Sequence, residues 1–249
     1  MKILKYKKIS RGRYKLTTDT SELVLYEDVI LKNNLLYNKD ITLEILEKVM
    51  NENIYYEAYD LSLSFIEKKL RTKKEVINYL EDKGFNKRVI DETIKKLESV
   101  NLLNVRAYVE AYVNDKVNLG NSGPYKIKKE LVNLGIDEEE INEYLNTISE
   151  DIWLSKLDKI VDKKMVSLKN KSLFMIKNKL NMDLAIMGYD KNMINEVLSK
   201  LTKNDGEAIK KEMEKAYNKY SKKFEGDALK WQIKNHLYRK GYIVSDIEL

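Results

Sequence analysis

The sequence has no cysteine, one proline and one histidine among its 249 residues. Without cysteine, neither a disulfide framework nor a thiolate metal site can form, and one histidine cannot make a multi-histidine metal centre. A His-based catalytic triad would have to use His236, which follows Lys234 and Asn235 on a predicted helix. We therefore predict no enzymatic activity, no metal and no cofactor. We interpret His236 as a surface or nucleic-acid-facing residue, with a catalytic base as the alternative.

Long apolar runs are also missing. No stretch of eighteen apolar residues occurs, and the basic N-terminus lacks the apolar centre of a signal peptide, so we predict no membrane segment and a cytoplasmic protein. The phosphate-loop pattern GxxxxGK[ST] is absent, which argues against ATP binding by that route. Only one proline and nine glycines interrupt the chain, and this scarcity favours long helices.

What the sequence does contain is a repeated pattern centred on Gly84. Two aliphatic residues precede this glycine, a hydrophobic residue follows it, and three more apolar residues lie six, ten and thirteen positions later: Val76, Leu80, Phe85, Ile90, Ile94 and Leu97. Similar offsets recur around Gly135, Gly188 and Gly241. Counted from Gly84, successive glycines of this set are 51, 53 and 53 residues apart. Apolar residues four apart indicate an amphipathic helix, and a glycine four residues later supplies the left-handed position that ends it.

The pattern translates into three helices per repeat. The apolar set after each glycine predicts a second amphipathic helix, and a further helical stretch lies ahead of each hairpin, for example 58–70. A period near fifty residues is typical of arrays in which neighbouring units bury each other's faces. The predicted fold is therefore mainly α: an elongated array of tandem three-helix repeats with a small β-containing N-terminal region.

The segment boundaries follow from composition and from helix caps. Residues 1–54 are predicted as a β-meander (3–9, 13–16 and 23–26) and two short helices (27–33 and 41–50, the second with Asp40 as N-cap). The predicted repeats are 55–104, 105–152, 153–203 and an incomplete fourth at 204–249. Capping signals are a Thr72/Glu75 capping box, Pro124 at a first helical position, and the N-cap candidates Ser172, Asp227 and Ser245.

Charge is concentrated in particular places. The net charge is +6, and residues 1–20 carry seven Lys or Arg against one Asp, so the remainder is balanced. Acid-free basic runs occur at 68–74 and 163–179, and another cluster is Lys215, Lys219, Lys222 and Lys223. Stacked repeats would bring such runs onto one side, making a basic stripe suited to a polyanion. The alternative is that these lysines only solvate helix ends.

Two other features have competing interpretations. The acidic run 137–140 suits a magnesium ion, but it also lies at a predicted helix start, where the helix dipole favours negative side chains. The capping interpretation is the simpler one. The seventeen tyrosines could stack on nucleic-acid bases, although most, including Tyr79 and Tyr144, are better interpreted as helix-surface or packing residues.

Several segments together resemble the RecX family of recombination regulators. They are AYDLSLSFIEKKLRTKKEVINYLEDKGF, LESVNLLNVRAYVEAYV, GPYKIKKELVNLGI and KSLFMIKNKLNMDLAIMGYDKNMINEVL, and with the β-rich start they span nearly the whole chain. The most specific piece runs from Lys69 through Thr72 to Val76. One departure is that Asn104 and Val105 stand where the family usually has an acidic pair.

The resemblance implies a function. Family members bind the RecA recombinase and its filament on single-stranded DNA, so we expect a monomeric regulator, most simply an inhibitor, acting in homologous recombination, DNA repair and the SOS response. The alternative is a stand-alone helical-repeat DNA-binding protein. The residues we predict to contact RecA or DNA are Lys68, Lys69, Arg71, Lys73, Lys74, Lys126, Lys128, Lys129, Lys169, Lys171, Lys177, Lys179, Lys230, Lys234, Arg239 and Lys240.

Overall fold

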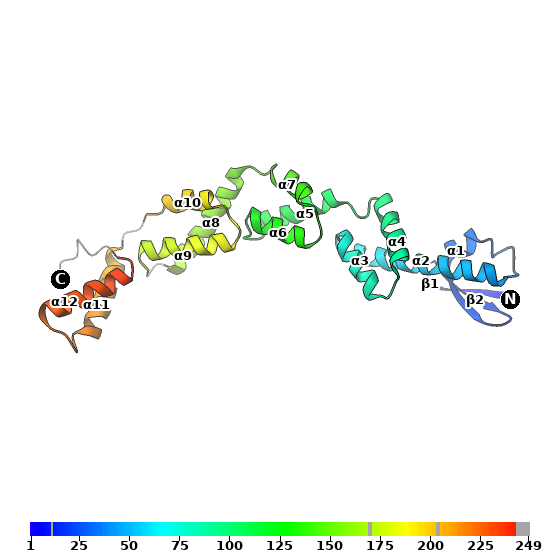
Figure 1. The fold of residues 1–249 in the computed structure, drawn as a ribbon, viewed down its shortest axis with the longest axis horizontal. Helices are drawn as coiled ribbons and strands as arrows, with labels where there is room; N and C mark the ends of the chain where they lie inside the picture. The colour runs from blue at the N-terminus through cyan, green and yellow to red at the C-terminus, as the bar shows by residue number, and fades with distance from the viewer. Residues whose placement is uncertain (11, 169–170, 203–204, 243–249) are drawn as a thin grey trace. The chain divides into compact units, whose positions relative to one another are not determined.

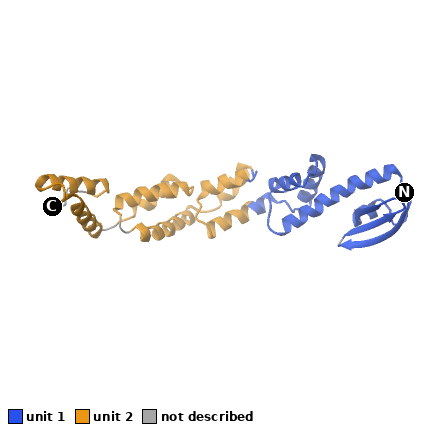
Figure 2. Ribbon diagram, turned by 90° about the horizontal axis from the view of Figure 1, so that it is seen from below, with its two compact units in different colours: residues 1–108, 134–136 blue, residues 109–133, 137–249 orange. Residues whose placement is uncertain are grey.

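The computed structural model describes residues 1–10, 12–168, 171–202 and 205–242. Within them the chain is mainly helical, with twelve helices and one three-stranded sheet (Figure 1). It divides into two compact units, one formed by residues 1–108 and 134–136 and the other by 109–133 and 137–249 (Figure 2). The predicted fold class, three-helix repeats behind a small β region, is confirmed.

The N-terminal sheet is antiparallel, in the order β1–β2–β3. Its strands are β1 (Ile3–Ser10), β2 (Arg13–Thr18) and β3 (Glu22–Tyr26), and α1 (Glu27–Lys32) follows directly. Ile3, Leu16 and Leu25 are buried together with Val29 of α1, so one face of the sheet is closed by the helix. The predicted β-meander is thus confirmed, with each strand within two residues of its expected bounds.

The helix after this region is longer than predicted. α2 runs without interruption over Leu43–Glu67, with Thr42 as N-cap, and Asp40 forms only an isolated β-bridge with Lys2. The prediction of a short helix at 41–50 capped by Asp40 is therefore wrong. α2 serves two cores, because Val49 packs with the sheet whereas Ala58 packs with the first repeat. Residues 54 and 55, at a predicted boundary, lie within this helix.

From α2 onward, the described helices form three groups of three and a final pair. α2 is followed in the first repeat by α3 (Lys73–Asp82) and α4 (Lys87–Ser99). The second repeat holds α5 (Val105–Asn118), α6 (Pro124–Asn133) and α7 (Glu138–Leu145), and the third holds α8 (Glu150–Leu168), α9 (Leu173–Ile186) and α10 (Lys191–Ser199). The last hairpin is α11 (Gly206–Tyr220) and α12 (Gly226–Arg239).

The four repeat glycines end helices in the way the sequence predicts. Gly84, Gly135, Gly188 and Gly241 all have left-handed φ values, of 85°, 83°, 86° and 76°. At Gly84 the glycine N–H donates to the Glu81 carbonyl at 2.9 Å, and the Phe85 N–H donates to the Leu80 carbonyl at 3.2 Å. These two bonds form a Schellman motif, which satisfies carbonyls at the end of α3.

Three of the predicted caps are confirmed. Thr72 and Glu75 form a complete capping box, Pro124 is the first residue of α6, and the Ser172 hydroxyl accepts the Met175 N–H. Asp227 is not an N-cap, because α12 begins one residue earlier behind Glu225. Ser245 lies outside the described residues.

In the second unit, two repeats meet through glycine backbone. The Gly123 N–H donates to the Met187 carbonyl at 2.7 Å, and the Tyr125 N–H donates to the Gly188 carbonyl at 3.1 Å. The turn that ends α9 therefore caps the start of α6. A similar contact joins the next pair, where the Ser172 hydroxyl at the start of α9 donates to the Lys240 carbonyl at 2.6 Å. Helix ends thus satisfy each other's free backbone groups between successive repeats.

Candidate nucleic-acid interface

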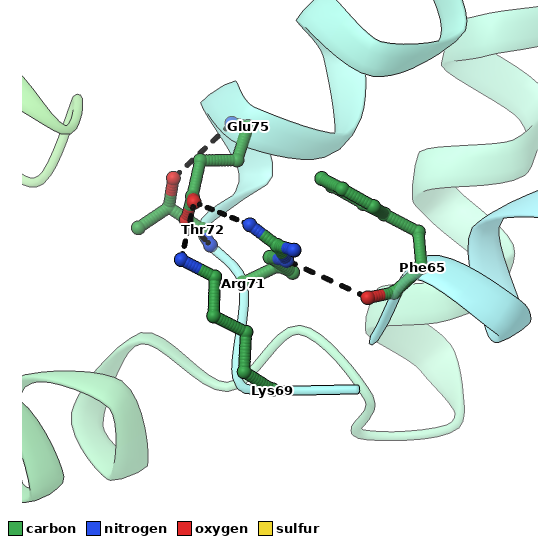
Figure 3. Close-up of polar contacts among 5 residues, drawn as sticks. All are labelled: Phe65, Lys69, Arg71, Thr72 and Glu75. Atoms are coloured by element: carbon green, nitrogen blue, oxygen red, sulfur yellow. Dashed lines mark hydrogen bonds and ion pairs between the residues drawn. The ribbon is translucent and has the colours of Figure 1, made fainter. Parts of the chain in front are cut away.

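The first basic run lies between α2 and the first turn of α3 (Figure 3). Arg71 points inward: its guanidinium lies 3.8 Å from the Phe65 ring centroid and donates to Glu75 Oε1 at 3.1 Å. Only 16% of its side chain is exposed. The same Glu75 accepts the Thr72 N–H at 2.9 Å and lies 3.8 Å from Lys69 Nζ. Arg71 is therefore packed and paired within the fold.

Glu75 is ionised at the centre of this cluster. Its partial burial acts to raise the pKa of the carboxyl group, but the Thr72 N–H and the Arg71 guanidinium outweigh burial and lower that pKa. Phe65 also stacks on Tyr79 at a centroid distance of 4.3 Å, so the interpretation of Tyr79 as a packing residue is confirmed. The cluster fixes the α2–α3 turn from which the neighbouring lysines project.

We predict that Arg71→Gln will destabilise the first unit by about 1–2 kcal/mol, because it removes a stacked guanidinium and leaves Glu75 with fewer partners. Lys68→Gln, an exposed neighbour, should change stability by less than about 0.5 kcal/mol. Urea denaturation followed by circular dichroism measures both. Equal, small effects of the two substitutions would show that Arg71 is only a solvated cation.

The other residues of this run differ in their surroundings. Lys68 and Lys69 are exposed, and Lys73 is paired with Glu98 at 2.9 Å. Lys74 is exposed too, although the aliphatic part of its side chain lies beside Gly135. An exposed lysine that is paired with a surface carboxylate can still bind a polyanion, because exposed ion pairs are weak.

The candidates in the later repeats are mostly exposed. On α6, Lys126 and Lys129 face solvent, whereas Lys128 is paired with Glu138 at 2.6 Å. In the third repeat, Lys171 is exposed, Lys177 is half-buried and Lys179 lies 3.7 Å from Asp183. Lys169 lies outside the described residues. On α12 and at its end, the exposed candidates are Lys230, Lys234, Arg239 and Lys240. A single stripe that joins all repeats stays a prediction.

The sequence does not single out two lysines that the structure places in a cleft. Lys156 and Lys159 lie on α8 and line this cleft together with Lys163 and Lys164. Asp158 interrupts the run, so a search for acid-free stretches passes over it. Helical periodicity is the signal that finds the pair, since positions three and seven apart share one helix face.

The acidic run lies at the start of a helix, and the histidine lies beside a carboxylate. Glu138, Glu139 and Glu140 form the first turn of α7, where the helix dipole favours them, and Asp137 is the N-cap without a side-chain cap bond. Within the described residues, no cluster of three His, Asp or Glu side chains could hold a metal ion. His236 is partly buried: its side chain is 18% exposed, and Nε2 lies 3.4 Å from Glu212 Oε2. Its predicted contact with nucleic acid stays a prediction.

Known proteins resemble this chain over its whole length. Family models for the first and second three-helix domains of RecX match residues 58–97 and 106–145. The regulatory protein RecX of Streptococcus agalactiae serotype V is 34% identical over 100% of this chain and 97% of its own. That of Lactococcus lactis subsp. cremoris is 29% identical over 92% of this chain and 88% of its own.

Two solved structures of RecX proteins have a fold similar to that of this chain. A crystal structure of a regulatory protein RecX matches with a TM-score of 0.69 at 20% identity, covering 81% of this chain and 100% of the other. The crystal structure of RecX from Lactobacillus salivarius matches with a TM-score of 0.57 at 26% identity, covering 60% of this chain and 97% of the other. Among the described helices, none is long and apolar enough to cross a membrane. The near-complete overlap with these relatives, together with the two domain matches, shows that the chain belongs to the RecX family of regulatory proteins.

Proposed function

We propose that this protein regulates homologous recombination and DNA repair by binding the RecA recombinase and its filament on single-stranded DNA, and that it inhibits the filament. The observation that carries the proposal is the 34% identity to a regulatory protein RecX over the full chain. The proposal includes a monomeric, cytoplasmic protein that acts by binding, without catalysis or a cofactor, in the SOS response.

The distribution of basic residues supports a binding mode that uses several repeats. Exposed lysines occur on α6 of the second repeat and on α12 of the fourth, and others flank the α2–α3 turn of the first. Each exposed cation contributes little alone, but several repeats that engage one filament raise the effective concentration of the others. Tandem repeats are well suited to this, because they present similar surfaces at regular intervals.

We expect the protein to lower the single-strand-dependent ATPase rate of RecA when present at well below one copy per RecA subunit. A regulator that contacts the nucleoprotein filament can act at such a ratio, since one molecule affects a stretch of filament. The measurement is a titration of this protein into RecA assembled on a fixed amount of single-stranded DNA. An unchanged rate over the whole titration would contradict the proposal.

The alternative, a stand-alone DNA-binding protein, is favoured by the seven basic residues and one acidic residue in 1–20. Such a protein would compete with RecA for the strand and would have to cover it to reduce the ATPase rate. Inhibition would then require amounts that scale with DNA length, and it would disappear once RecA is assembled before the protein is added. The same titration, with the order of addition reversed, separates the two functions.

A further inference from the structure

A cleft of about 560 Å³ lies within the second unit, between α8 and the segment that joins α5 to α6. One wall is a face of α8 with Lys156, Lys159 and Lys163. The other wall is the segment 117–121. Lys156 and Lys159 lie outside the basic runs and contact residues that the sequence predicts, whereas Lys163 begins the predicted run 163–179. No residue of the α2–α3 turn lines this cleft.

The lysines of this cleft fall into two classes. Lys156 and Lys164 are already used: Lys156 Nζ donates to the Lys116 carbonyl at 2.5 Å and to the Ser122 carbonyl at 3.4 Å, and Lys164 pairs with Asp183 at 2.6 Å. Lys156 thereby holds the opposite wall against α8. It is half-buried, and burial lowers the pKa of its ammonium group.

Lys159 and Lys163 are the spare cations. Both are exposed, they lie one helical turn apart, and among the described residues neither has an ion-pair partner. Asp158 and Asp162 are next to them in sequence but do not line the cleft. The one carboxylate in the lining is Asp151, so the cleft has an excess of positive charge.

The wall opposite the lysines offers neutral contacts. Asn118 and Asn121 are exposed and carry amide groups that can both donate and accept hydrogen bonds. Leu119 between them is 85% exposed, and Ile152 on the α8 side is 46% exposed. The cleft thus combines spaced ammonium groups with amides and apolar surface.

We infer that this cleft binds the phosphodiester backbone of a single-stranded nucleic acid, with phosphates on Lys159 and Lys163 and a base against the 118–121 segment. A nucleotide carries an anion and a neutral, partly apolar ring in each unit, which matches both walls. No arginine lines the cleft, whereas planar recognition of protein carboxylates favours arginine. The inference rests on the proposed function for the presence of single-stranded DNA, and it adds the site.

The test compares two double variants of the full chain in binding to a fluorescent oligothymidylate. Lys159→Gln with Lys163→Gln removes the spare cations. Lys87→Gln with Lys191→Gln removes the same charge from the exposed first residues of α4 and α10. We expect the first variant to lower the log–log salt slope by about 1.4, from roughly 0.7 per lost single-strand contact, and the control to leave it unchanged.

Over a salt range from about 50 to about 200 mM, that slope change makes the parent-to-variant affinity ratio shrink about sevenfold. Equal log–log salt slopes for the parent and the cleft variant would overturn the inference, and so would a parent that does not bind oligothymidylate. With polyglutamate as a second, phosphate-free polyanion, a cleft variant that loses binding only to polyglutamate would overturn it too. So would competition by inorganic phosphate as effective, per phosphate, as the oligonucleotide. The RecA ATPase titration of the parent tests the proposed function separately, because naked-DNA binding requires no RecA.

Discussion

Gly188→Ala is expected to destabilise the second unit by about 3 kcal/mol, roughly three times as much as Gly84→Ala destabilises the first. Both glycines have the same left-handed backbone, with φ values of 86° and 85°. That conformation alone costs a residue with a Cβ about 1 kcal/mol. The difference between the two positions comes from what surrounds them.

A Cβ at Gly188 would lie 2.5 Å from the Lys126 Cβ and would also clash with the Lys126 backbone nitrogen, whereas a Cβ at Gly84 would meet nothing within 4 Å. Relief of the clash requires the α9 turn to move away from α6, which breaks the hydrogen bonds from Gly123 and Tyr125. Overpacking of this kind typically costs about 1–3 kcal/mol in addition to the backbone strain.

Urea denaturation followed by tryptophan fluorescence measures the effect on the second unit, and circular dichroism measures the effect of Gly84→Ala on the first unit, which contains no tryptophan. Trp153 is 3% exposed, and its ring lies 6.5 Å from that of Tyr189, the residue after Gly188. Gly123→Ala is a useful companion, since Gly123 has no positive φ but a Cβ there would lie 2.5 Å from the Gly188 carbonyl oxygen. It should cost about 2 kcal/mol from the clash alone. Equal losses for Gly84→Ala and Gly188→Ala would show that the contact between repeats carries no energy.

The sequence predicts the glycine turns well because their cause is local. A left-handed residue at fixed distance from two apolar stripes has one simple interpretation, and all four glycines adopt it. The close approach of Gly188 to Lys126 has no such local signal. It depends on how one repeat packs on the next, and the offsets around a glycine are similar whether its turn is packed, as at Gly188, or open, as at Gly84.

The error at α2 has a different origin. Repeat periodicity suggests a boundary near residue 55, but no glycine or proline lies between 41 and 67 to end a helix there. Thr42 rather than Asp40 caps the helix, and its hydroxyl accepts the Ile45 N–H at 3.2 Å. The period of a repeat therefore locates its core residues, whereas the ends of its helices depend on local start and stop signals.

The candidate site is less predictable than the fold. Arg71 belongs to the first basic run in the sequence, yet its guanidinium is stacked on Phe65 and paired with Glu75. Lys159 is next to Asp158 and appears neutralised in the sequence, yet on the helix it shares a face with Lys163. Linear charge counts cannot separate these cases, because burial and helical phase decide which cations are available.

The second large effect concerns four exposed candidates on α6 and α12. Replacement of all four by glutamine should lower the log–log salt slope of single-stranded DNA binding by about 3, from roughly 0.7 per phosphate contact. The fold should change little, because solvated side chains at such positions contribute little to stability. Arg71 is left intact because its guanidinium is packed on Phe65 and paired with Glu75, so its replacement would change the stability of the fold. The four residues are Lys126, Lys129, Lys230 and Lys234.

A matched control removes the same total charge from four basic residues that are already paired with carboxylates at 2.5–3.1 Å and that lie outside the predicted contact residues and basic runs. They are Lys15, Lys32, Arg88 and Lys200. If only net charge matters, both quadruple variants will lose affinity to the same extent, and the assignment of the candidate residues is wrong. If the residues touch phosphates, the slope falls for the first variant alone.

A RecA titration on the same two variants then identifies the partner of these lysines. Contacts with DNA phosphates predict that naked-DNA affinity and filament inhibition fall together. Contacts with carboxylates of RecA predict that inhibition falls while naked-DNA binding barely changes, because the protein surface is then the only anion lost. A first variant that binds DNA and inhibits RecA as the parent does would leave these side chains as a solvated helix surface, without a role in either contact.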